Sequence, residues 1–221
     1  LVATGRVRIP DFQRSFRWEN KDVVALFDSL HQGYPIGNLL MWKRDAPEHR
    51  VIVGSIEIDA PRRSDALWLV DGQQRVTSIA NAMDARSEGD ARFAVGYDLE
   101  NARIVSTKGR RSRSVMPFYL LFDFESAWKW FEERAEIQSL RGRYMEAFNV
   151  FNAVSVPATV LEDADEDKLR VIFDRINQSG KKLQSFEVFH ALNSSMSDGR
   201  TLRSISDAVA RATNFGVTSE S

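Results

Sequence analysis

The sequence contains no cysteine, so disulfide bonds, thiolate metal sites and cysteine nucleophiles are excluded together. No apolar run approaches the roughly 20 residues that a helix needs to cross a bilayer. The amino terminus also lacks the succession of charged, apolar and small residues that marks a signal peptide. These absences predict a cytoplasmic protein that works under reducing conditions and has no membrane partner.

An excess of one charge is missing as well, because 30 Lys and Arg residues face 31 Asp and Glu residues and leave a net charge of −1. A balanced charge exerts no general attraction on nucleic acid, so any DNA binding depends on local clusters. One such cluster comprises Lys108, Arg110, Arg111 and Arg113. It predicts weak, salt-sensitive contacts with a DNA backbone, and a solvated loop between two strands is the alternative.

Three standard sites are absent from the sequence. Gly180-Lys181-Lys182 looks like the end of a phosphate-binding loop. That motif needs Gly at position 175 and Ser or Thr at position 182, but this sequence has Arg175 and Lys182, which excludes it. No two glycines are spaced as Gly-x-Gly, which excludes the dinucleotide-binding fingerprint. The three histidines stand far apart, which excludes a His-x-x-x-His zinc pair.

Apolar periodicity predicts an α+β fold. The apolar run 67–70 has the length of a buried strand, and from residue 73 the apolar spacing changes from strand-like to helical. Further strands are predicted at 38–43, 51–58, 92–98, 102–106 and 154–161, and helices at 20–33, at 125–152 and in three segments beyond residue 168. These elements indicate a mixed core over residues 1–124 and a mainly helical half over residues 125–221.

The segment Asp71-Gly72-Gln73-Gln74-Arg75 occupies the predicted strand-to-helix junction. Gly72 permits a sharp turn, and the backbone amides of the next three residues then face outward at the positive end of a helix dipole. We expect Arg75 to point at solvent and offer a forked donor to a phosphate, and Asp71 to hold a hydrated magnesium ion. The alternative is a capping Asp71 and a surface Arg75 with nothing bound.

Two other segments carry candidate binding residues. Arg14 and Arg17 alternate with aromatic residues and can present guanidinium groups to phosphate beside stacking rings, or simply be solvated charges. A predicted helix ends in an amide-rich loop that contains Asn177 and Gly180. That loop can border a phosphate or sugar, while a helix stop with Gly180 in the left-handed conformation is the alternative.

The motif segments follow one another along the chain at residues 9–14, 17–18, 34–37, 70–78 and 175–180. In this order they resemble the DUF262 family, the amino-terminal half of GmrSD-type modification-dependent restriction proteins, across about residues 6–195. The resemblance implies a ParB/sulfiredoxin-like core with a packed helical C-terminal half. It also implies that the segment 71–75 binds and hydrolyses a nucleoside triphosphate and controls a DNA-cutting partner.

Our first hypothesis is therefore a nucleoside triphosphatase domain of an anti-phage restriction system. Its proposed catalytic residues are Asp71, Gln74 and Arg75, with Mg²⁺ at Asp71, and its proposed nucleotide-binding residues are Arg14, Arg17, Gly72, Gln73, Gln74, Arg75, Asn177 and Gly180. The alternative hypothesis is a non-catalytic module that senses modified DNA.

The beginning at Leu1 and the polar end of the chain predict a fragment of a longer protein. We expect its partner to be a C-terminal nuclease domain or a separate effector subunit. The His-Asn-His nuclease half that often follows this kind of domain is absent from the sequence, so we expect no DNA cleavage by this chain.

Overall fold

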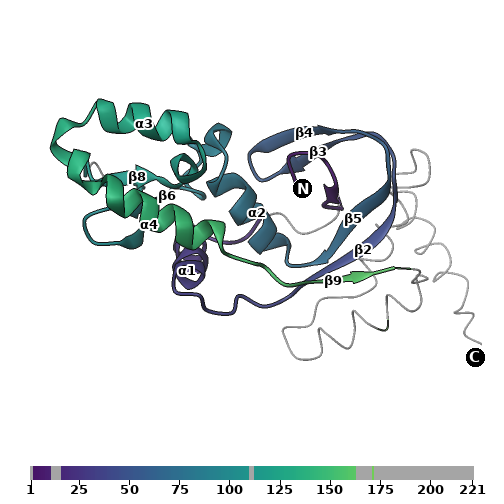
Figure 1. Ribbon diagram of the computed structural model, residues 1–221. Coiled ribbons are helices and arrows are strands. Elements are labelled where there is room, and N and C mark those ends of the chain that lie inside the picture. Colours follow the sequence, from purple (N-terminus) through teal and green to yellow (C-terminus); the bar gives the residue numbers. More distant parts are fainter. Residues whose placement is uncertain (1, 11–15, 110–111, 163–170, 172–221) are drawn as a thin grey trace, which may run out of the picture. The chain divides into compact units, whose positions relative to one another are not determined.

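The structure is a computed structural model that describes residues 2–10, 16–109, 112–162 and 171 (Figure 1). The chain divides into two compact units, Leu1–Ile9 with Arg14–Asp163 and Pro10–Gln13 with Ala164–Ser221. Every helix and strand named below belongs to the first unit. The three helical segments predicted beyond residue 168 lie outside the described residues.

A mixed four-stranded sheet forms the first part of this unit. Its strand order is β1 (Val7–Arg8), β5 (Arg63–Asp71), β2 (Leu39–Ala46) and β9 (Ala158–Leu161). β5 runs parallel to β1 and antiparallel to β2, while β9 runs parallel to β2. Residues 66–70 of β5 are all buried, as expected for a strand covered on both faces.

A hairpin of β3 (His49–Val53) and β4 (Ile56–Ala60) corrects the prediction of one strand over residues 51–58. Gly54 adopts a φ of +66°, which lets the chain reverse within two residues. The burial alternates at Val51 and Val53 and again at Ile56 and Ile58, but the spacing of three between Val53 and Ile56 shifts this alternation at the turn. The prediction of one strand treated the two apolar stretches as one run and missed this shift.

The second part of the unit is built from helices and a small antiparallel sheet. The sheet has the order β7 (Arg103–Ser106), β6 (Val95–Asp98) and β8 (Val115–Pro117), so the predicted strand pair is confirmed. The helices are α1 (Asn20–His31), α3 (Phe124–Glu132) and α4 (Arg141–Asn152), with short 3-10 turns η1 (Ala85–Ser87), η2 (Phe118–Phe122) and η3 (Ala135–Leu140). These elements confirm the mostly helical prediction for residues 125–152.

Helix α2 (Gln73–Ala82) contributes to two hydrophobic cores. Its residue Val76 belongs to the core of the four-stranded sheet and the hairpin, and Ala82 belongs to the core of α1, α3, α4 and the small sheet. The fold is thus α+β, as predicted. The ParB/sulfiredoxin-like core and the division at residue 124 stay predictions.

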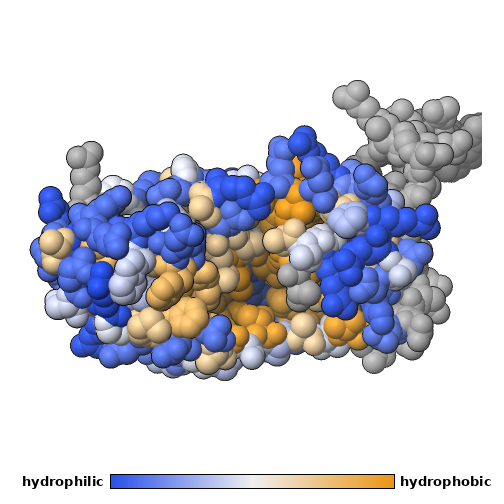
Figure 2. All heavy atoms as spheres, turned by 45° about the horizontal axis from the view of Figure 1, so that its top comes forward, coloured by the Kyte–Doolittle hydropathy of each residue, from blue (hydrophilic) through white to orange (hydrophobic). Residues whose placement is uncertain are grey.

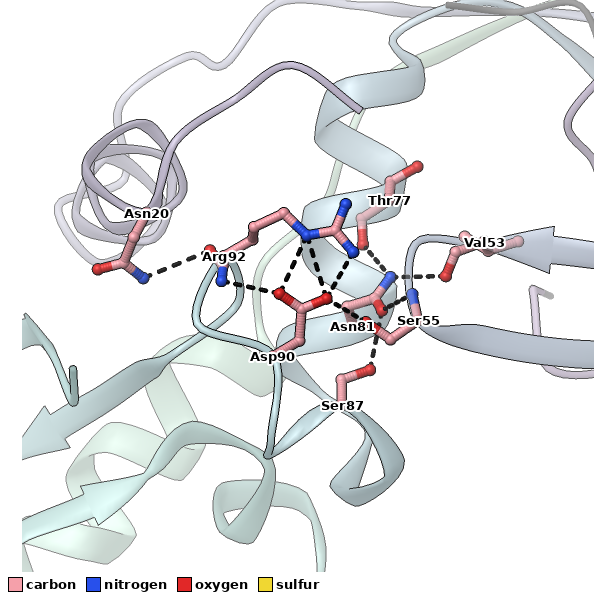
Figure 3. A network of polar contacts seen from close by, with 8 residues as sticks. All are labelled: Asn20, Val53, Ser55, Thr77, Asn81, Ser87, Asp90 and Arg92. Atoms are coloured by element: carbon pink, nitrogen blue, oxygen red, sulfur yellow. Dashed lines mark hydrogen bonds and ion pairs between the residues drawn. The ribbon is translucent and has the colours of Figure 1, made fainter. Parts of the chain in front are cut away.

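A buried asparagine joins α2 to the hairpin and to η1 (Figure 3). The Asn81 side chain is almost completely buried, and its amide nitrogen donates to the carbonyls of Val53 at 2.9 Å and Thr77 at 2.8 Å. Its amide oxygen accepts from the Ser55 backbone N–H at 2.9 Å and from the Ser87 hydroxyl at 2.8 Å. All the usual hydrogen-bonding capacity of this amide is therefore used.

The network continues from the hairpin to the start of α1 (Figure 3). The Ser55 hydroxyl donates to Asp90, which also accepts from the backbone and the guanidinium of Arg92. The Asn20 side chain at the start of α1 in turn donates to the carbonyl of Arg92 at 3.3 Å. Polar contacts thus connect α2, the hairpin and α1.

We predict that Asn81→Ala lowers the free energy of unfolding by about 2–4 kcal/mol, because buried backbone groups of the hairpin lose their partner. Ser87→Ala is the matched control, since it removes one of the four bonds and is expected to cost about 1 kcal/mol. Urea denaturation of both variants measures the difference. Equal losses would mean that Asn81 does not fix the hairpin to α2.

The acid dependence of stability provides a second prediction. The Arg92 guanidinium, helped by the Ser55 hydroxyl, holds the pKa of Asp90 well below its ordinary range, although partial burial opposes this shift. A carboxyl whose pKa is lowered by folding stabilises the protein above its unfolded pKa of about 3.9, and this contribution is lost as the pH falls below that value.

We expect Asp90→Asn to be less stable than the parent by about 1 kcal/mol at pH 7, a value that allows for solvent screening of the partly exposed Arg92. The difference should shrink as the pH is lowered from about 5 towards 2. Denaturation curves at several pH values test this. A difference that stays constant down to pH 2 would contradict the ionic role of Asp90.

Candidate functional site at the start of helix α2

The strand-to-helix junction predicted at Asp71–Gly72 is confirmed. β5 ends at Asp71, Gly72 is the N-cap residue with a φ of +98°, and α2 begins at Gln73. A Cβ at position 72 would overlap the Leu39 side chain, so both the conformation and the close approach require glycine. No side chain caps α2, and the capping role considered for Asp71 is therefore wrong.

The first turn of α2 has backbone donors that make no hydrogen bond to other described residues. The Val76 N–H is bonded to the Gly72 carbonyl at 3.0 Å, which is the first hydrogen bond of the helix. The N–H groups of residues 73–75 precede it and have no partner within the helix. Together with the helix dipole they favour an anion at this end of α2.

Arg75 does not point at solvent, contrary to the prediction from sequence. Only 15% of its side chain is exposed, and its Nη2 lies 3.2 Å from Asp71 Oδ2. Its Nη1 donates to the Ile36 carbonyl at 2.9 Å. A Cβ at Gly37, whose φ is +84°, would lie 2.8 Å from the same Nη1. Arg75 thus fixes the loop before β2 and the Asp71 carboxylate.

Gln74 brings a second predicted segment to the start of α2. Its side-chain oxygen accepts hydrogen bonds from the backbone N–H groups of Arg17 at 2.9 Å and Trp18 at 3.2 Å. The Arg17 residue itself is exposed. Two of the segments singled out in the sequence therefore meet, and Gln74 holds the backbone of one of them. A catalytic role for Gln74 stays a prediction.

Asp71 alone does not make a metal site, but it suits a metal ion that also binds a substrate phosphate. Its side chain is 41% exposed, and within the described part of the chain its Oδ1 accepts no hydrogen bond. Among the described residues, no group of three or more His, Asp or Glu side chains is arranged so that it could hold a metal ion. A magnesium ion that keeps several waters and binds one carboxylate plus substrate phosphates fits this single carboxylate.

Of the remaining predicted residues, the structure describes Lys108 and Arg113. Lys108 is exposed, and Arg113 lies 2.7 Å from Glu136, whose carboxylate raises the pKa of the Arg113 guanidinium. This ion pair balances one charge of the proposed DNA-binding cluster. The other predicted residues, Arg14, Arg110, Arg111, Asn177 and Gly180, lie outside the described residues.

An apolar cavity of about 420 Å³ lies along another part of α2 and is lined mostly by aliphatic side chains of α2, β2 and β4. Figure 2 shows hydrophobic side chains gathered in a hollow between hydrophilic margins. The charged residues of the cavity, Asp84 and Arg86, lie 2.7 Å apart and balance each other. This cavity therefore does not favour an anion.

Sequence reasoning assigned no role to Ile36 and Gly37, which contact Arg75 in the structure. Residues 34–37 entered the sequence analysis only as one segment of the family resemblance, and nothing in the sequence indicated that Arg75 is their partner.

Comparison with known proteins agrees with the motif order. The profile of the GmrSD restriction endonuclease N-terminal domain matches residues 1–194. The chain belongs to this family. A curated relative, the uncharacterized protein MJ0686 of Methanocaldococcus jannaschii, is 25% identical over 230 residues. The alignment covers 85% of this chain and 39% of the relative, so the chain spans about two fifths of the relative's length.

Membership of the GmrSD N-terminal domain family confirms the resemblance seen in the motifs of the chain. None of the helices in the described ranges is both long enough and apolar enough to span a membrane.

We predict that Gly72→Ala destabilises this GmrSD domain by about 2–4 kcal/mol, because alanine must adopt a left-handed conformation and displace Leu39. Gly89→Ala is the matched control, since a Cβ there meets no atom within 4 Å and no left-handed φ is required. The control should change stability by no more than about 0.5 kcal/mol. Thermal or urea unfolding compares the two, and equal effects would remove the structural reason for Gly72.

Proposed function

We propose that this domain binds a nucleoside triphosphate at the start of α2, hydrolyses it, and thereby regulates a DNA-cutting restriction protein. The observation that carries the proposal is the left-handed Gly72 turn, which leaves the first amides of α2 unpaired within the helix beside an acidic and a basic side chain. Amides at a helix start are a common phosphate-binding arrangement. Membership of a restriction family supports a regulatory role in DNA cutting.

The residues at the junction have different roles in the proposed function. The amides of residues 73–75 hold phosphate oxygens, and the exposed Arg17 adds a charged donor. Gln74 fixes the backbone of Arg17, since its side chain accepts the Arg17 N–H. Arg75 acts as a positioning residue, because both of its terminal nitrogens already hold groups of the protein.

Asp71 orients the attacking water or a hydrated magnesium ion through its Oδ1. Such an ion would neutralise part of the charge on the phosphates. Arg75 keeps the Asp71 carboxylate in place through the contact at Oδ2. This arrangement gives Asp71 one fixed oxygen and one that is available to the reaction.

The proposed partners are DNA, plain or modified, and either a C-terminal nuclease domain or a separate effector subunit. The chain spans 39% of its curated relative, which leaves room for such a domain in longer proteins of this kind. Lys108 and the basic residues after it are the proposed DNA contacts, and the affinity should be weak because the charge of the chain is balanced.

Arg17→Ala should weaken nucleoside triphosphate binding about tenfold, which corresponds to about 1.4 kcal/mol, without loss of stability. Arg17 is exposed, and within the described residues its backbone N–H makes its one hydrogen bond. Isothermal titration calorimetry with magnesium and each common nucleoside triphosphate measures the affinity, and phosphate release measures hydrolysis.

Arg62→Ala is the matched control, since Arg62 is an exposed arginine that precedes β5, at the strand end remote from Asp71. It should leave the affinity unchanged. Equal affinity of the Arg17 variant and the parent would remove Arg17 from the site. Failure of the parent to bind any triphosphate would overturn the proposed function.

A further inference from the structure

A cavity of about 450 Å³ lies beside the loop that Arg75 holds. One wall comes from the end of α1 and the following loop, at residues 30–37, and the other from the end of α4 and the following chain, at residues 150–157. Its volume falls within the roughly 300–1,000 Å³ of cavities that bind small molecules. The cavity is therefore large enough for a nucleoside.

Two helices end at this cavity. α1 ends at His31 and α4 ends at Asn152, and carbonyl groups of a last helical turn carry partial negative charge. Among the described residues that line the cavity, none is Lys, Arg, Asp or Glu. This environment disfavours a phosphate and is compatible with a neutral group.

One aromatic side chain of the cavity suits a planar ring. Tyr34 lines the cavity and is 62% exposed, so its ring is open to a ligand. His31 also lines the cavity, but its ring already packs against Tyr97 and Phe151, and its Nε2 lies 3.3 Å from the Tyr97 hydroxyl. An exposed aromatic ring on which a base can stack is a feature of sites that bind nucleotides.

The Arg75 guanidinium connects the wall of this cavity with the end of β5. Its Nη1 bonds to the carbonyl of Ile36, which lines the cavity, and its Nη2 contacts Asp71 at the end of β5. A Cβ at Gly37 in the cavity wall and a Cβ at Gly72 would lie 2.8 Å and 3.2 Å from these two nitrogens. Arg75 thus contacts both a residue that lines the cavity and the residues that precede α2.

We infer that this cavity binds the nucleoside part of the nucleotide whose phosphates lie at the start of α2. The inference rests on the proposed function. The polarity of the helix ends sets the orientation, because phosphates are attracted to the start of α2 and the base to the ends of α1 and α4. Tyr34 is the residue that stacks on the base.

The test compares Tyr34→Ala with the parent in calorimetry, with nucleoside triphosphates and inorganic tripolyphosphate as separate ligands. We expect roughly tenfold weaker nucleoside triphosphate binding, since stacking on one aromatic ring has an effect of this size, and unchanged tripolyphosphate binding. Phe124→Ala is the matched control, because Phe124 is an aromatic residue of α3 that is 61% exposed and does not line the cavity. A second variant, Val154→Trp, fills the cavity and should give the same selective loss.

The possible outcomes separate the inference from the proposed function. Unchanged nucleoside triphosphate affinity in both cavity variants overturns the inference and leaves the function intact. Equal loss of tripolyphosphate binding overturns it as well, because the variants would then act on the phosphate site. Parent protein that binds tripolyphosphate as tightly as nucleoside triphosphate shows that the nucleoside adds nothing. Parent protein that binds neither ligand overturns both.

Discussion

The guanidinium of Arg75 lies against two glycines and joins segments of the chain that are 39 residues apart in sequence. It holds the Ile36 carbonyl on one side and the Asp71 carboxylate on the other. A side chain at Gly37 or Gly72 would crowd this group, so the arginine and both glycines depend on one another. This side chain thus links the loop before β2, the end of β5 and the first turn of α2, in addition to the pairing of β2 with β5.

Helix α2 is also fixed by polar contacts along its length. Near its start Gln74 accepts two backbone N–H groups, and near its end Asn81 bonds to the β3–β4 hairpin and to Ser87 (Figure 3). A buried amide that makes all of its hydrogen bonds specifies one arrangement of the packed elements, which apolar contacts alone do not. The amides at the start of α2 are therefore presented by a helix that is anchored in two hydrophobic cores.

The ends of three helices differ in polarity around the proposed site. The start of α2 carries partial positive charge, and the ends of α1 and α4 carry partial negative charge. In the proposed function this difference orients a ligand that is anionic at one end and neutral at the other. A restriction protein that responds to nucleotide in this way would use backbone groups for binding and leave Asp71 for the reaction.

The sequence by itself determined the junction at Asp71–Gly72, because the apolar period changes from strand to helix there and because glycine permits the turn. It also determined α1, the pair of β6 and β7, and membership of the GmrSD family, since each depends on local spacing or on motif order. Only the tertiary structure decided that Arg75 turns inward to bond the Ile36 carbonyl, because this partner is a distant backbone group that no local pattern records. It likewise separated β3 from β4, because the pairing of two short apolar stretches is a contact between strands that composition alone does not reveal.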